Sequence, residues 1–134
     1  MSTKQILIRE NDTEWTKGSS MLGDKCLYEG KELAYFKILS DKRKEGKGIA
    51  YMLKFVPPEG KMIKTVAKAR SEENVYIIKG NMRDKRGDIK MTPNDYALNE
   101  TGHPHSQFVM DESIALVICS GDIDKTIDFG VVDI

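Results

Sequence analysis

Turn residues interrupt this chain at intervals of roughly ten residues, and this regularity limits the fold more than any other feature of the sequence. Gly, Pro, Asn or Asp occurs in each of the stretches Asp41–Gly48, Pro57–Gly60, Arg83–Gly87 and Pro93–Asp95. Between the turns, apolar residues recur at two-residue spacing or in short runs, which is typical of β-strands and leaves no long amphipathic helix. We therefore predict an all-β chain, closed into a barrel because closure removes exposed strand edges.

The same alternation assigns strands along most of the chain. The expected strands are Gln5–Arg9, Leu33–Leu39, Ile49–Val56, Met62–Ala69, Asn74–Lys79, Asn81–Arg83, Asp88–Met91, Asp95–Leu98, Ser113–Ser120 and Thr126–Val132. A chain of 134 residues has room for one hydrophobic core and not for two. We expect one domain over residues 1–134, with an N-terminal strand and irregular segment in 1–32 and the barrel in 33–134.

Composition and charge narrow the classes of partner. Hydrophobic residues make up 40% and charged residues 31% of the chain, which is ordinary for a folded globular protein. Twenty-one basic and 21 acidic residues give a formal net charge of zero, which argues against binding to nucleic acid or to anionic membranes. The segment Met1–Arg9 has only a short apolar run, so we expect neither a signal peptide nor a membrane span. The prediction is a cytoplasmic protein whose Cys26 and Cys119 stay as thiols.

The segment from Gly60 to Gly80 carries a characteristic spacing of glycine and glutamate. It reads GKMIKTVAKARSEENVYIIKG. This resembles the first motif of the cupin family, in which a glycine, a His-x-His pair, a glutamate and a second glycine follow one another at set intervals. Gly60, Glu73 and Gly80 match the glycine and glutamate positions, whereas Val66 and Lys68 stand at the two histidine positions.

The segment Gly87–Val117 resembles the second cupin motif, as written in the subgroup similar to anti-sigma-factor cupins. There, Pro-x-Gly-x-x-His leads into a strand. Glu100–His105 keeps the glycine and the histidine of that pattern, with glutamate in the proline position. A competing register puts Pro93 at the proline position and Leu98 at the histidine position. We prefer the first register because it retains His105 as well as the glycine.

The resemblance implies a cupin-type antiparallel β-barrel, also called a double-stranded β-helix or jelly roll. It also implies a homodimer, formed by adding the Ile6–Ile8 segment to a neighbour's sheet. Cupins hold iron, manganese, nickel or zinc through histidines and a glutamate. Of these ligand positions, only Glu73 and His105 are retained in this sequence, so the resemblance implies these two as metal ligands. His103 is a candidate third ligand, because residues two apart share a strand face. Pro104 between them favours a surface loop without a ligand role.

The replaced histidines point to a different chemistry. Four side chains are expected to face one barrel interior, namely Val66, Lys68, Glu73 and His105. We hypothesise that an ion pair of Lys68 with Glu73 replaces the metal, which makes these two the catalytic candidates. The preferred alternative is a lysine stem that lines the barrel while its head reaches water. Arg70 shares the strand face of Lys68 and is a further candidate for binding an anionic ligand, the alternative being a salt bridge at the rim.

Three kinds of function follow from these residues. The preferred one is a cupin that binds a small organic molecule in its barrel, with weak or no metal binding. The alternative is a metal-dependent dioxygenase, isomerase or lyase that uses Glu73, His105 and, in one version, His103. The third is an interaction protein whose barrel is filled by side chains. The sequence names no substrate and leaves open whether the protein is an enzyme.

Overall fold

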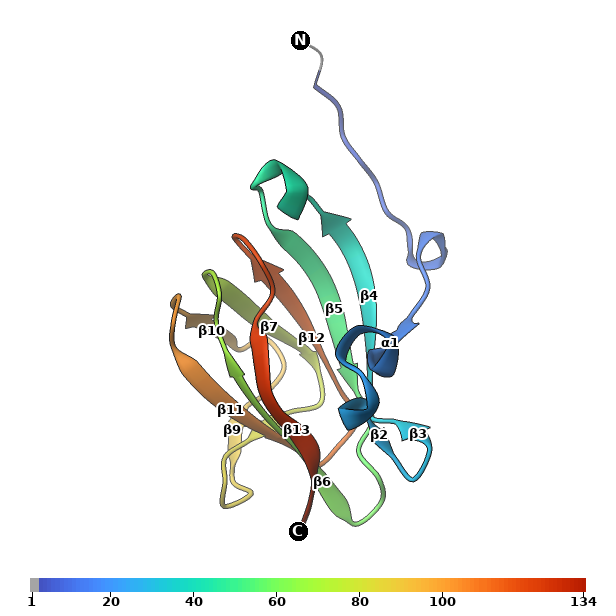
Figure 1. Cartoon of the computed structure of the whole chain (residues 1–134), viewed down its shortest axis with the longest axis vertical. Coiled ribbons are helices and arrows are strands. Elements are labelled where there is room, and N and C mark those ends of the chain that lie inside the picture. Colours follow the sequence, from blue (N-terminus) through green and yellow to red (C-terminus); the bar gives the residue numbers. More distant parts are fainter. Residues whose placement is uncertain (1–2) are drawn as a thin grey trace.

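Two antiparallel β-sheets stacked face to face form the body of the molecule, as a computed structural model that describes residues 3–134 shows (Figure 1). The larger sheet contains, in spatial order, β1 (Thr16–Lys17), β4 (Ala34–Asp41), β5 (Ile49–Phe55), β12 (Ser113–Cys119), β7 (Glu73–Lys79) and β10 (Tyr96–Asn99). The smaller sheet contains β13 (Lys125–Asp133), β6 (Lys61–Lys68), β11 (Pro104–Val109), β8 (Met82–Arg83) and β9 (Ile89–Met91). This two-sheet arrangement confirms the prediction of an all-β jelly roll.

The N-terminal part is irregular and carries the short elements outside the two sheets. These are the 3-10 turns Glu10–Asp12 and Asp24–Cys26, the helix α1 (Gly18–Leu22) and the small hairpin of β2 (Leu27–Tyr28) with β3 (Lys31–Glu32). A further 3-10 turn, Arg43–Glu45, joins β4 to β5. No helix in residues 3–134 has the length and apolar character needed to cross a membrane.

The predicted strand Gln5–Arg9 is wrong. In the structure this segment is unpaired and extends away from the sheets, with Ile6 63% and Leu7 58% exposed (Figure 1). Alternating sequence alone does not make a strand, because the backbone N–H and C=O groups need a neighbouring strand to pair with.

Strand β11, Pro104–Val109, is the longest strand that the sequence predictions missed. The proline favours a loop by sequence alone, but Pro104 is the first residue of the strand, a position at which a missing N–H is tolerated. The strand pairs with β6 over its whole length, and His105 lies opposite Ala67 in this pairing. The pairing gives His105 a fixed place in the smaller sheet.

The core lies between the sheets and follows the two-residue alternation of the strands. On β7, Glu73 and Ile77 are buried on the inner side, whereas Tyr76 and Ile78 are exposed on the outer side. The largest fully buried apolar side chains are Leu33, Ile63, Ile77 and Val109. The free thiols Cys26 and Cys119 are buried as well.

Gly80 directly follows β7 and has a backbone conformation that other residues rarely adopt. Its φ is +78°, and an added Cβ would lie 2.2 Å from Ser113 Oγ. That hydroxyl group also accepts a hydrogen bond of 3.0 Å from the backbone N–H of Asn81. The close approach of the two chains explains the glycine at this point, and it holds β7 against the beginning of β12.

Candidate metal and ligand site

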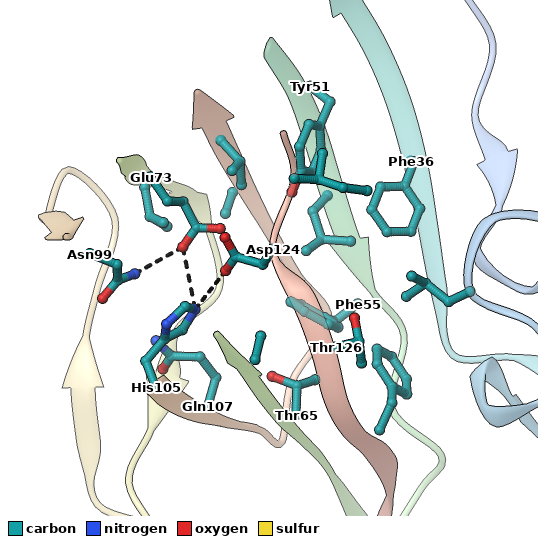
Figure 2. A pocket seen from close by; sticks show the side chains of 18 of the residues that line it. Phe36, Tyr51, Phe55, Thr65, Glu73, Asn99, His105, Gln107, Asp124 and Thr126 are labelled. Atoms are coloured by element: carbon teal, nitrogen blue, oxygen red, sulfur yellow. Dashed lines mark hydrogen bonds and ion pairs between the residues drawn. The ribbon is translucent and has the colours of Figure 1, made fainter. Parts of the chain in front are cut away.

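A cavity of about 100 Å³ lies between the two sheets. Most of its wall is apolar, with Phe36, Phe55 and Phe129 among the lining side chains. Polar groups gather at one end of it, as Figure 2 shows. They come from Glu73, Asn99, His105, Gln107 and Asp124.

The imidazole of His105 stands between two carboxylates (Figure 2). Its Nε2 atom is 3.3 Å from Glu73 Oε1 and 2.9 Å from Asp124 Oδ2. The side-chain amide of Asn99 donates a hydrogen bond of 2.9 Å to the same Glu73 Oε1. One ligand atom from each of Glu73, His105 and Asp124 lies within 4.8 Å of the other two. The three side chains therefore form one compact cluster.

Strands of both sheets bring these side chains together. Glu73 is the first residue of β7 in the larger sheet, and it faces inward. His105 on β11 pairs with Ala67 on β6, which pairs in turn with Thr126 on β13. Ala67 is on β6, the strand between β11 and β13, and its side chain is only a methyl group. We infer that this small side chain leaves the room in which the imidazole meets the carboxylate of Asp124.

Asp124 is held in place through the loop that leads into β13. Two residues earlier, the carboxylate of Asp122 accepts a hydrogen bond of 3.1 Å from Arg43 and one of 3.3 Å from Arg70. The hydroxyl group of Ser71 donates a hydrogen bond of 2.9 Å to the backbone carbonyl of Asp122. This network ties the loop to the β4–β5 and β6–β7 connections, so the position of Asp124 depends on three separate parts of the chain.

The cluster retains protons more strongly than its residue types imply. Burial, helped by the adjacent carboxylate of Asp124, raises the pKa of Glu73 to about 7. The hydrogen bond to Asp124 raises the pKa of His105. Burial opposes this effect, and the charge of Glu73 raises the pKa further. Protons therefore offset part of the negative charge of the two carboxylates around neutral pH.

Two oxygen atoms of the site lack a hydrogen-bond partner in residues 3–134. They are Asp124 Oδ1 and Gln107 Oε1, and both are buried. A buried acceptor without a partner costs free energy, which a bound cation or water molecule would offset. Imidazole nitrogen and carboxylate oxygen are donors that suit manganese, iron, nickel and zinc. The residues present therefore fit a divalent metal ion.

Glu73 and His105 are the predicted site residues that the structure brings together. Val66 and Lys68 do not join them, because the inner side of β6 is formed by Thr65 and Ala67. Lys68 is exposed at the end of the strand, and the hypothesised ion pair of Lys68 with Glu73 is wrong. Side chains alternate between the two faces of a strand. If the inward positions are assigned one residue out of place, every side chain of the strand is therefore assigned to the wrong face.

Arg70 and His103 lie outside the cluster. Arg70 is exposed and forms the salt bridge with Asp122 at the rim, which was the alternative considered for it. The ring of His103 is exposed, and its centroid is 6.4 Å from that of His105. The backbone carbonyl of His103 lies 3.3 Å from His105 Nδ1, a contact that orients the imidazole.

Asp124 is the member of the cluster that sequence reasoning missed. It belongs to neither cupin motif, and nothing in the local sequence distinguishes it from Asp122. Asn99 and Gln107 were missed as well, although both follow the inward parity of their strands. Only the packing of the last loop against the barrel assigns Asp124 to the site.

Comparison of the sequence with protein-family models and with curated proteins found no match. Solved structures do match. An RmlC-like cupin from Shewanella frigidimarina superimposes with a TM-score of 0.61, at 14% sequence identity, over 90% of this chain and 96% of that one. This chain has a cupin fold. The expectation taken from the two motifs is confirmed at the level of the fold.

Two other structures show the range of proteins that share this cupin fold. An acetylacetone dioxygenase from Acinetobacter johnsonii has a TM-score of 0.58 at 14% identity, covering 90% of this chain and 76% of that one. The Rhodobacter sphaeroides complex of SigE with the anti-sigma ChrR has a TM-score of 0.54 at 20% identity, covering 83% of this chain and 51% of that one. Identities this low establish the fold and leave the activity to be argued from the site.

Proposed function

We propose that this cupin-fold chain binds a divalent transition-metal ion through Glu73, His105 and Asp124, and that a small oxygen-bearing organic molecule binds beside the ion. The observation that carries the proposal is the convergence of three ligand atoms within 4.8 Å. The unpartnered Asp124 Oδ1 is a second support. An ion held by three protein ligands keeps open positions at which it polarises an organic oxygen atom. Iron, manganese, nickel and zinc are the candidate metals.

The size and lining of the cavity limit what enters it. Pockets for drug-sized ligands usually measure roughly 300–1,000 Å³, and this cavity measures about 100 Å³. It accommodates an ion with a few water molecules, or one end of a small ligand. The apolar wall beyond the cluster keeps that end dry, which strengthens electrostatic interactions with the ion. The activity we propose is accordingly that of a metal-dependent cupin enzyme of the dioxygenase, isomerase or lyase kind.

Metal analysis tests the proposal. Protein purified without chelator should bind Zn²⁺ or Co²⁺ at one equivalent per chain in calorimetric titration, and Glu73→Gln and Asp124→Asn should each weaken binding at least about tenfold. Glu72→Gln is the matched control, because Glu72 is an exposed neighbour of Glu73 outside the cluster. No binding by the unaltered chain, or equal binding by all variants, would contradict a metal site at this position.

A second candidate function is binding of a small organic molecule without a metal. It is favoured by the pairing of His105 with both carboxylates, because an imidazolium shared by Glu73 and Asp124 neutralises part of their charge. In that case the cluster is a closed ion network and the titrations with Zn²⁺ and Co²⁺ show no binding. The calorimetric titration therefore decides between the two functions.

We further propose that the partner of the chain is a second copy of itself. The outer face of the larger sheet exposes apolar side chains on adjacent strands, from Tyr76, Ile78, Tyr96, Leu98 and Ile118. The Ile6–Ile8 segment is exposed on the same chain. Residues 3–134 of one copy cover neither surface, and pairing of the two surfaces would bury both. Light scattering should give the mass of a dimer, and Leu98→Lys should convert it to a monomer; a monomeric unaltered chain would contradict this proposal.

A further inference from the structure

A second hollow opens on the side of the barrel where both sheets end. Strand β10 is the last strand of the larger sheet and β9 is the last strand of the smaller one. Between them, residues of β9, β10 and β11 line an open groove of about 400 Å³. This volume lies in the range of small-molecule sites, unlike that of the inner cavity.

The groove and the inner cavity share part of their walls. Asn99, His105 and Gln107 line both of them. A molecule lying in the groove therefore contacts the side chains that border the metal-ligand cluster. This arrangement gives the organic ligand a place to lie while one of its ends reaches the cluster.

The groove carries a cation that forms no salt bridge within residues 3–134. The ammonium group of Lys90 donates a hydrogen bond of 3.1 Å to the backbone carbonyl of Ser106, which adjoins His105 in the chain. Within residues 3–134, no carboxylate lies within salt-bridge distance of Lys90. Although the residue as a whole is exposed, desolvation of its ammonium group lowers the pKa of Lys90, and the negative charge of Asp84 opposes this shift. An ammonium group has three donors, so it can accept further anionic partners.

The groove and the inner cavity differ in their charged groups. The ammonium of Lys90 lies on the groove wall, whereas Glu73 and Asp124 lie behind the wall that the groove shares with the inner cavity, where both contact the imidazole of His105. Lys90 therefore attracts an anionic group along the groove. One ammonium compensates one negative charge, which matches a carboxylate.

We propose that the groove binds a small monocarboxylic acid, with its carboxylate at Lys90 and its oxygen-bearing end beside His105, Asn99 and Gln107. The position of the inner end depends on the proposed function of the cluster. The carboxylate contact depends only on the groove. The proposal implies that the ligand is an oxo or hydroxy acid and not a neutral molecule, whether it acts as a substrate or as an effector.

The test compares 2-oxobutyrate with 2,3-pentanedione, a neutral molecule of similar shape. Binding is followed by ¹H–¹⁵N NMR titration, using the side-chain amides of Asn99 and Gln107 and the backbone amides of β11. We expect 2-oxobutyrate to shift these signals and to bind at least about tenfold more tightly than the diketone, as one charge-assisted hydrogen bond predicts. Lys90→Met should remove this preference. Lys85→Met, an exposed lysine in the preceding turn, should leave it unchanged.

Equal affinity for the two probes, equal losses in both lysine variants, or signal shifts away from β10 and β11 would overturn the proposal. A titration with Zn²⁺ separates this result from the fate of the metal site. Lys90→Met should bind Zn²⁺ as tightly as the unaltered chain does. If the unaltered chain does not bind Zn²⁺ but prefers 2-oxobutyrate through Lys90, the groove proposal stands and the metal proposal fails.

Discussion

Two neighbouring strands of the smaller sheet contribute very differently to the site. Strand β6 matches the cupin segment that carries the His-x-His pair, yet its inward residues Thr65 and Ala67 offer no imidazole. Strand β11 beside it supplies His105, and the two carboxylates come from β7 and from the loop before β13. The small inward side chains of β6 leave room in which donors from three other segments meet.

The largest effect should come from removing the imidazole that β11 supplies. His105→Ala deletes the nitrogen ligand and leaves two buried carboxylates facing each other, so Zn²⁺ affinity should fall about a hundredfold or more, about 3 kcal/mol. Isothermal titration calorimetry measures this change in Zn²⁺ affinity. His103→Ala, which removes an exposed ring outside the cluster, is the control and should change affinity less than about twofold. Equal losses in the two variants would place the metal elsewhere.

The next effect is a pH dependence of stability in the metal-free protein. Glu73 has a pKa of about 7 in the folded chain against an ordinary value of 4.5. The folded state therefore binds more protons than the unfolded state between these values, and the free energy of unfolding should fall as the pH rises through this window, by up to about 3 kcal/mol. His105 acts in the same direction, because its raised pKa stabilises the fold below 6.5 and that stabilisation is lost at higher pH.

Urea unfolding at pH 5, 6, 7 and 8 measures this slope. Glu73→Gln should remove the contribution of Glu73 and flatten the curve between about pH 5 and 7. Saturating Zn²⁺ should oppose the trend, because metal binds the deprotonated ligands. Stability that rises with pH in the metal-free chain would show that the cluster does not retain protons.

A smaller effect should follow from giving β6 the ligand that it lacks. Thr65→His places an imidazole on the inward face of β6 and keeps the space at Ala67 free, so Zn²⁺ affinity should rise about tenfold. Lys68→His places the same group on the outer face and should leave the affinity unchanged. Comparing the two variants by calorimetry sharpens the assignment of faces on β6. A larger gain from Lys68→His would reverse that assignment.

The smallest effect concerns the loop that carries Asp124. Asp122→Asn weakens the hydrogen bonds from Arg43 and Arg70, and we expect Zn²⁺ affinity to fall a few-fold, under about 1 kcal/mol. Asp128→Asn is the matched control, since Asp128 is also exposed and pairs with Lys64 at 3.5 Å. An unchanged affinity in Asp122→Asn would show that the loop holds Asp124 without this network.

The sequence by itself determined the fold class and most strand positions. Alternation and turn residues suffice for this because strand periodicity and turn conformations are local properties of the chain. The spacing of Gly60, Glu73 and Gly80 led to the cupin fold, and the φ of +78° at Gly80 explains why that position needs glycine. Glu73 and His105 were found through the same motifs.

The charge pattern of β6 contradicts the inward positions that the cupin motif implies. Lys64 and Lys68 share one face of the strand, and Thr65 and Ala67 share the other. Charged residues on one face indicate the side turned to water. Following this alternation, and not the histidine positions of the motif, predicts the inward face that the structure shows.

The tertiary structure alone decided the composition of the site. Asp124 meets His105 because β11 and β13 both pair with β6, and Glu73 meets them because the two sheets stack. These distances depend on strand register and on loop packing between segments far apart in sequence, so no local pattern encodes them. The groove at Lys90 has the same origin, since it forms where the two sheets end side by side.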